Sequence, residues 1–218
     1  MRSRRSFLAA GATGVLAASA GCLGAVLGTE PIELTASRAA PSTAALESTG
    51  YDEPQSNEEH LEETIDVGVS REVRASYWVV ACSKDVDLDG LESPDGAFFV
   101  ALSMPGIDIL GRSFNPLEEV GNEELIDELL TQSGDDDGVE QVEPAGSVSR
   151  PILGEDRDVE HFEAISDVEE EAVELELSIT SFAHEDDLLV LLGGHPAALE
   201  GEANELATLF ESVEHPLE

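Results

Sequence analysis

Three aspartates at alternate positions form the strongest candidate ligand cluster in this sequence. Residues 85–90 read DVDLDG. Carboxylates at alternate positions followed by glycine begin an EF-hand loop, whose oxygen atoms surround Ca²⁺. The match then ends, because Gly96 occupies the position at which such a loop has its final glutamate. We keep two interpretations: a calcium site formed by Asp85, Asp87 and Asp89, and a solvated acidic turn, which is the ordinary outcome in so acidic a chain.

The histidines and cysteines show no spacing typical of a metal centre or an activated nucleophile. The sequence contains no HExxH, GxSxG or glycine-rich phosphate-binding motif, so no cofactor is expected. His195 and His215 each precede a proline, which indicates capping or packing beside the last predicted helix. Cys82 lies in the apolar run 77–82, so we expect a buried structural thiol rather than a redox group.

The first 22 residues have the composition of an export signal. A basic start is followed by a mildly apolar run over residues 7–16 and then by small residues. The start resembles a twin-arginine export motif. Residues 19–22 read SAGC and resemble a lipobox, which predicts that Cys22 is lipidated and anchors the chain to a membrane. The residues that carry the export motif are Arg4, Arg5, Phe7 and Leu8.

Two alternatives to lipidation remain open for this segment. Residues 18–20 read ASA, an A-x-A cleavage site that would release a soluble protein and leave Cys22 as an ordinary thiol. Residues 7–28 are also about long enough to span a bilayer if they are retained. Their many glycine, alanine and serine residues would make them a poor anchor.

The chain is extremely acidic. It has 48 acidic and 10 basic residues, a net charge of −38, and Lys84 is its only lysine. Because three basic residues precede Cys22, the part from Cys22 onward carries −41. Such a charge repels itself at ordinary ionic strength, but the Debye length falls to about 3 Å in molar salt. The composition therefore indicates a protein of a haloarchaeon, working in brine. It argues against nucleic-acid binding, since no basic patch exists.

Hydrophobic periodicity predicts one domain after the signal. We expect a signal peptide over 1–21, a tether over 22–30 and a single α+β domain over 31–218. The domain should contain a mainly antiparallel sheet with about three flanking helices. Residues 52–59 should form a loop, 85–96 an acidic turn, and the GGHP sequence at 193–196 should break the sheet. The predicted strands are 32–37, 65–69, 73–81, 97–102, 148–153, 159–165, 173–179 and 188–192, and the predicted helices begin near 41, 122 and 199.

Several segments together resemble a family of haloarchaeal lipoproteins of unknown function. They are residues 46–51 (LESTGY), residues 110–116 (LGRSFNP) and the C-terminal strand–strand–helix that ends in VEHP at 213–216. The resemblance implies no activity, cofactor or catalytic residue. The order of elements is also similar to PsbP-like domains, which are non-enzymatic assembly factors, but an analogy of fold assigns no function.

These observations favour a non-enzymatic accessory or binding module that is anchored through Cys22 and contacts an envelope component. One alternative is a secreted or anchored hydrolase whose acidic site is assembled from residues distant in sequence. Another is a calcium-dependent interaction domain that uses residues 85–90. The expected location is the outer face of the cytoplasmic membrane.

Overall fold

The computed structural model describes residues 31–66, 70–88, 91–106, 108–109, 112–113, 121–122, 125–126, 139–168 and 171–217. The export motif, Cys22 and Asp89 lie outside these residues. Among the described residues, no helix is both long enough and apolar enough to cross a bilayer.

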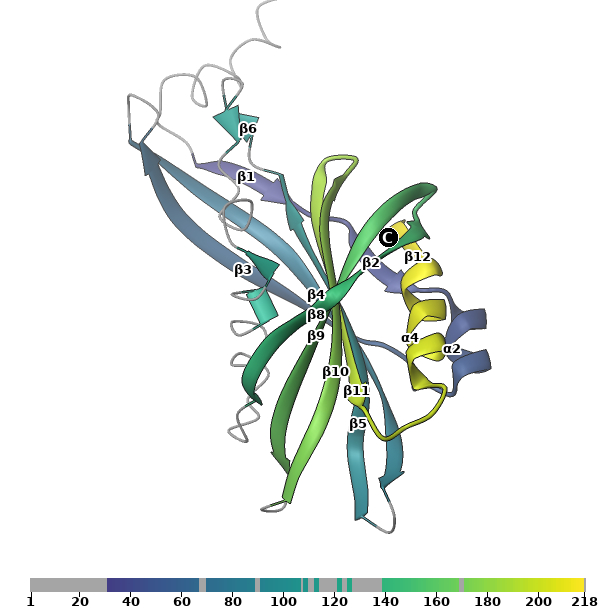
Figure 1. Ribbon diagram of the computed structural model, residues 1–218. Coiled ribbons are helices and arrows are strands. Elements are labelled where there is room, and N and C mark those ends of the chain that lie inside the picture. Colours follow the sequence, from purple (N-terminus) through teal and green to yellow (C-terminus); the bar gives the residue numbers. More distant parts are fainter. Residues whose placement is uncertain are drawn as a thin grey trace, which may run out of the picture. The chain divides into compact units, whose positions relative to one another are not determined.

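Among the described residues, the main sheet has eight strands, and the strand pairs whose register is defined are antiparallel. Its order is β1-β4-β5-β11-β10-β9-β8, with β3 also paired to β4 (Figure 1). These strands are β1 (Ile32–Thr35), β3 (Gln55–Asp66), β4 (Ser70–Leu88), β5 (Leu91–Pro105), β8 (Val139–Ile152), β9 (Glu155–Val168), β10 (Glu171–His184) and β11 (Asp187–Pro196).

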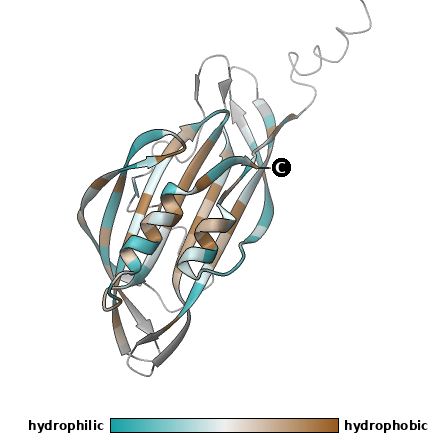
Figure 2. Cartoon of the chain, turned by 90° about the vertical axis from the view of Figure 1, so that its right-hand side faces the viewer, coloured by the Kyte–Doolittle hydropathy of each residue, from teal (hydrophilic) through white to brown (hydrophobic). Residues whose placement is uncertain are grey.

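In the described part of the chain, two short ladders and the helices α2 and α4 accompany this sheet. Strand β12 (Val213–Leu217) pairs with β2 (Arg38–Pro41), and β6 (Asp108–Ile109) pairs with β7 (Arg112–Ser113). Helices α2 (Thr43–Thr49) and α4 (Glu202–Glu211) lie beside each other on one side of the sheet, as Figures 1 and 2 show. The predicted α+β class with a mainly antiparallel sheet is confirmed.

The chain divides into two compact units. The described part of the smaller unit is residues 31–34, 61–66 and 70–74, where Arg74 bridges Glu62 at 3.0 Å and Glu72 at 2.6 Å. The larger unit contains residues 35–60 and the chain from residue 75 onward. The contacts of the candidate site described below lie in the larger unit.

The sequence predicts a short helix that opens at residues 41–42, runs through Leu46 and is stopped by Gly50, and α2 lies in this stretch. The Ser42 hydroxyl accepts a hydrogen bond from the Ala45 amide at 3.3 Å, which caps the first turn. Gly50 adopts a left-handed conformation with φ of 77°, and its amide donates to the Leu46 carbonyl at 2.9 Å. The helix predicted near 122 is described only at Asn122, Leu125 and Ile126, which are helical.

The sheet has a hydrophobic core on each face. The core under the helices joins Phe99 of β5 to Phe210 of α4, whose rings meet edge to face at 5.1 Å. The opposite core is built on alternate residues such as Leu177 and Ile179 of β10, and includes Leu125. Strand β11 is buried at every position because it lies in the middle of the sheet between these two cores.

Three expectations about where strands stop are wrong. Strand β3 starts at Gln55, inside the predicted loop 52–59; its first residues are mostly exposed, so the strand needs no apolar alternation. The predicted turn 85–96 is largely a hairpin, in which Val86 pairs with Ser93 and Leu88 with Leu91.

The third correction concerns the glycine pair in β11, which continues the sheet instead of breaking it. Gly193 pairs with Ser178 on one side and Phe99 on the other. A methyl group at Gly193 would lie 2.5 Å from Cδ1 of Leu206 in α4, and one at Gly194 would lie 2.7 Å from Leu177 and from the Phe98 ring. The glycines are therefore explained by close packing on both faces of the strand.

Candidate functional site

A chain of three titratable side chains links the β10–β11 hairpin to the C-terminal strand. His215 Nε2 lies 3.0 Å from Oδ2 of Asp187, and His215 Nδ1 lies 2.9 Å from Nδ1 of His184. The two rings meet edge to face. The side chains of His215 and Asp187 are 1% and 7% exposed, whereas His184 is half-buried. The chain therefore runs from a buried carboxylate towards the surface.

The hairpin and its neighbours fix the position of Asp187. His184 ends β10 and Asp187 begins β11, and the two face each other as the last pair of the ladder. Between them, Glu185 adopts a left-handed φ of 53°, and the Asp186 carbonyl accepts a hydrogen bond from the Gly106 amide at 2.8 Å. Oδ2 of Asp187 also accepts the Ser37 amide at 2.7 Å. A buried carboxylate needs such donors, since an unpaired one is costly.

This arrangement can hold a proton and pass it along. A carboxylate only accepts, so His215 donates from Nε2 to Asp187. The Nδ1 atom of His215 then faces the Nδ1 atom of His184, and one hydrogen lies between them. An aspartate that orients an imidazole in this way is a common element of acid–base chemistry. The hydrolase hypothesis remains a prediction, because the three side chains of Asp187, His215 and His184 alone identify no substrate.

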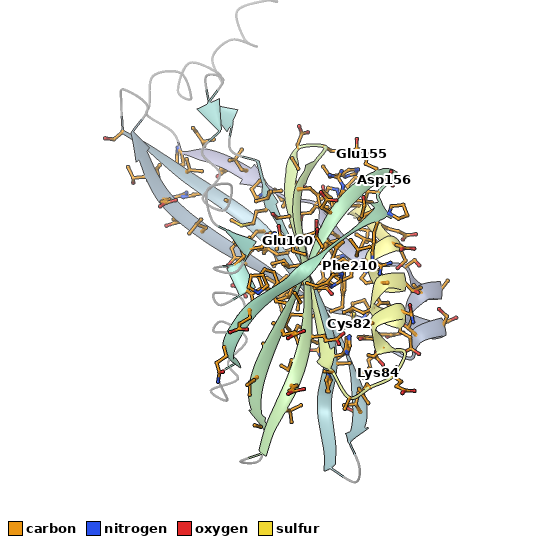
Figure 3. All side chains as sticks on the ribbon, viewed as in Figure 1. Cys82, Lys84, Glu155, Asp156, Glu160 and Phe210 are labelled. Atoms are coloured by element: carbon orange, nitrogen blue, oxygen red, sulfur yellow. The ribbon has the colours of Figure 1, made fainter. Side chains whose placement is uncertain are left out.

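A second cluster surrounds the only lysine of the sequence. Lys84 of β4 bridges Glu202 at 2.8 Å and also Glu205, both in the first turn of α4. The Lys84 ammonium lies 5.8 Å from the centre of the Tyr51 ring. Figure 3 shows Lys84, Cys82 and Phe210 on the side of the sheet that carries α4. The cluster therefore attaches α4 to the sheet.

The pKa values in this cluster follow from burial and charge. Burial acts to lower the pKa of Lys84, but hydrogen bonds and charges from Glu202 and Glu205 outweigh it and raise the pKa above 10.5. Burial raises the pKa of the Tyr51 phenol, and the nearby charge of Glu202 raises it further. Burial also raises the pKa of Cys82 to about 12. Cys82 is thus a buried neutral thiol, as expected, and its Sγ lies 3.8 Å from the Phe99 carbonyl oxygen.

The predicted calcium motif lies partly within a strand. Asp85 and Asp87 belong to β4, next to a register shift between Lys84 and Val86, and Asp89 lies outside the described residues. The residues that the structure describes contain no group of three potential ligands placed to hold a metal ion. Since Asp89 is part of the motif, calcium binding by Asp85, Asp87 and Asp89 stays a prediction.

Carboxylates form a row across three neighbouring strands. In the register of the sheet, Glu143 of β8 lies opposite Glu163 of β9, which lies opposite Glu176 of β10. All three are exposed. The row continues to the buried His195 of β11, whose Nε2 is 3.6 Å from Oε2 of Glu176 and whose Nδ1 donates to the Pro196 carbonyl at 3.0 Å. Like charges directly opposite each other destabilise a sheet.

Sequence reasoning missed the aspartate–histidine chain because its members come from separate parts of the sequence. One signal was present: the sequence predicts a hairpin of residues 173–179 and 188–192 with Glu185, Asp186 and Asp187 as its turn, which places Asp187 close to the end of the first strand. Nothing in the sequence indicated that His215, 28 residues from Asp187, would come between them. His215 was expected to pack beside the last helix, and it lies in β12 just after α4.

The described architecture is that of an α+β domain with a mainly antiparallel sheet. A family model, described as a domain of unknown function (DUF6517), matches residues 38–214. The chain therefore belongs to the DUF6517 family. The search of curated proteins finds no match for it. The resemblance noted above is thus supported in the coarser form, as a family without an assigned function.

Proposed function

We propose that this chain is a non-enzymatic accessory or binding module of a haloarchaeal cell surface. A lipid on Cys22 would hold it at the outer face of the cytoplasmic membrane, and the folded domain would engage an envelope protein. The export pattern and the lipobox-like residues 19–22 support this location and the lipid anchor. The structure contributes one observation on the solvent, which is the row of carboxylates.

The carboxylate row supports a protein that works in concentrated salt. Directly opposed residues on neighbouring strands have Cβ atoms only about 5 Å apart. That separation is shorter than the Debye length of about 10 Å in dilute buffer, but longer than the roughly 3 Å of molar salt. Glu143, Glu163 and Glu176 therefore repel one another strongly only in dilute buffer. Their alignment costs little in brine.

Glu163→Gln should reveal this repulsion, because Glu163 is the middle member of the row. We expect the substitution to raise the free energy of unfolding by about 1 kcal/mol in dilute buffer and by close to zero in molar KCl. Urea unfolding over a series of KCl concentrations measures the effect. The matched control is Glu160→Gln, an exposed residue of the same strand that lies opposite Ser147 and Ile179. Equal salt dependence in both variants would contradict the role given to the row.

Substitution of Cys22 tests whether a lipid anchors the protein to the membrane. We expect Cys22→Ser to move the protein from the membrane fraction to the medium, since two lipid chains give stable attachment and their loss removes it. Fractionation and immunoblotting measure the shift. Arg4→Lys with Arg5→Lys is the control and should keep the protein inside the cell. Retention of Cys22→Ser in the membrane would overturn lipid anchoring, and recovery of the wild type from the medium would indicate cleavage after Ala20.

The same fractions test the binding role. A tagged wild-type chain, solubilised from membranes in molar salt, should co-purify with a defined envelope protein at a constant ratio. A chain recovered alone after mild cross-linking would count against the binding module.

A further inference from the structure

We propose that Asp187, His215 and His184 form a proton-controlled latch, which holds strand β12 to the turn of the β10–β11 hairpin. Three segments meet at Oδ2 of Asp187. The hairpin supplies the carboxylate, the connection between β1 and β2 supplies the Ser37 amide at 2.7 Å, and β12 supplies His215 Nε2 at 3.0 Å. His184 then contacts the other side of the His215 ring at 2.9 Å. These side-chain contacts join the C-terminal strand β12 to the main sheet.

The latch acts where the β12–β2 ladder is interrupted. Val213 pairs with Pro41 and Glu214 with Ala40, but the register shifts before Leu217 pairs with Arg38. His215 lies within this irregular stretch. The backbone therefore contributes least to holding β12 at the point where the side chain of His215 contributes most. Local opening of the strand should depend on the side-chain contacts.

The geometry sets how many protons the latch can take. His215 carries hydrogen on Nε2, since Asp187 can only accept. Two facing Nδ1 atoms 2.9 Å apart share a single hydrogen. His184 can gain a proton on its Nε2 without losing the contact. A further proton would place hydrogen on both Nδ1 atoms, which would then repel. The contact thus survives one added proton and is lost with the second.

The surroundings leave His184 as the entry point for protons. His184 is half-buried, whereas His215 and Asp187 are enclosed. On strand β5, the residue opposite Asp187 is Pro105, and this proline carries no charge. The elements around the latch carry further charged groups, among them Glu185 and Asp186 of the turn, Glu214 of β12 and Arg38 of β2. Arg157 of β9 stacks on Phe182 of β10.

Hydrogen exchange of the backbone amides tests the latch. It should be measured on the folded protein in molar KCl from about pH 8 to about pH 5, the range in which histidine titrates, and expressed as protection factors. In the wild type, we expect protection of β12 to fall about tenfold on acidification, in line with the loss of one net hydrogen bond. In His184→Phe the fall should disappear, because phenylalanine takes no proton and leaves Nδ1 of His215 free to bind one.

The matched control is His60→Phe, which removes an exposed histidine whose ring Nδ1 lies 2.9 Å from the Ser76 hydroxyl. It should keep the wild-type profile. The same acid-dependent fall in wild type and His184→Phe would overturn the proposal. If His184→Phe does not fold, the imidazole nitrogen resonances of the wild type decide instead. We expect hydrogen on Nε2 of His215 at neutral pH, and hydrogen only on Nδ1 would overturn the latch.

Discussion

Lys84→Met should lower the free energy of unfolding by about 3 kcal/mol, as expected when one partner of a largely buried ion pair is removed. The Glu202 side chain is 7% exposed, and its Oε1 is buried without a hydrogen-bond partner among the described residues. Without the lysine, this carboxylate keeps the favourable field at the start of α4 and the neighbouring Tyr51 hydroxyl, but no positive charge that an ion pair would supply. Urea unfolding in molar KCl measures the change.

Matched variants separate this effect from the loss of a surface charge. Lys84→Met combined with Glu202→Leu should cost less than Lys84→Met alone, because no unpaired charge remains. Arg150→Met removes the more exposed bridge from Arg150 to Glu211, 3.0 Å long, and should cost less than about 1 kcal/mol. Equal losses in Lys84→Met and Arg150→Met would contradict the structural role of Lys84.

The lysine also gives this effect a defined pH dependence. The folded state raises the pKa of Lys84 above 10.5, so the folded state binds its proton more tightly than the unfolded chain does. The stabilisation is therefore complete below about pH 10 and is lost as the pH rises through the folded-state value. The difference between wild type and Lys84→Met should shrink in that alkaline range.

Gly193→Ala should lower the free energy of unfolding by about 2 kcal/mol, the usual cost of overpacking a core. The added methyl group would meet Leu206 of α4, which is 1% exposed and has little room to move. The three atoms nearest the added methyl group all belong to Leu206, so the cost measures how closely α4 packs on β11. Thermal and urea unfolding in molar salt would both report it.

A double-mutant cycle with Leu206→Ala identifies the contact. Leu206→Ala alone should cost about 3 kcal/mol through the cavity it leaves. The pair should cost clearly less than the sum, because each change relieves the other. Gly121→Ala is the control, since a methyl group there meets nothing within 4 Å. Additive costs at Gly193 and Leu206 would show that the clash is not with this side chain.

Local patterns were enough to predict much of the sheet and one helix. The alternation over 173–179 and the acidic turn after it predicted the β10–β11 hairpin, and both halves pair as expected. The capping serine and the glycine around α2 act as predicted. In these places each residue carries its own signal, either a side chain that alternates between faces or a backbone conformation that glycine adopts easily.

The errors arise where a neighbour from elsewhere in the chain decides the conformation. Strand β3 looks like a loop because its polar residues reflect exposure, while its backbone is held by β4. The glycines of β11 look like a break, although their missing side chains accommodate Leu206, Leu177 and Phe98. The contacts of the candidate site could not be predicted for the same reason, since Lys84 contacts Glu202, which lies 118 residues further along the chain. No local pattern encodes such a contact.

The placement of Lys84 determines which chemical tools can be used on this protein. Lysine is the usual target of amine-directed labels and cross-linkers, and the only one in this sequence is engaged by two carboxylates. An acylated N-terminal cysteine would remove the terminal amine as well. Amine coupling would then report on the attachment of α4, since reaction requires that the ion pair open. A search for a surface partner is better served by carboxyl-directed reagents, for which the exposed glutamates offer many sites.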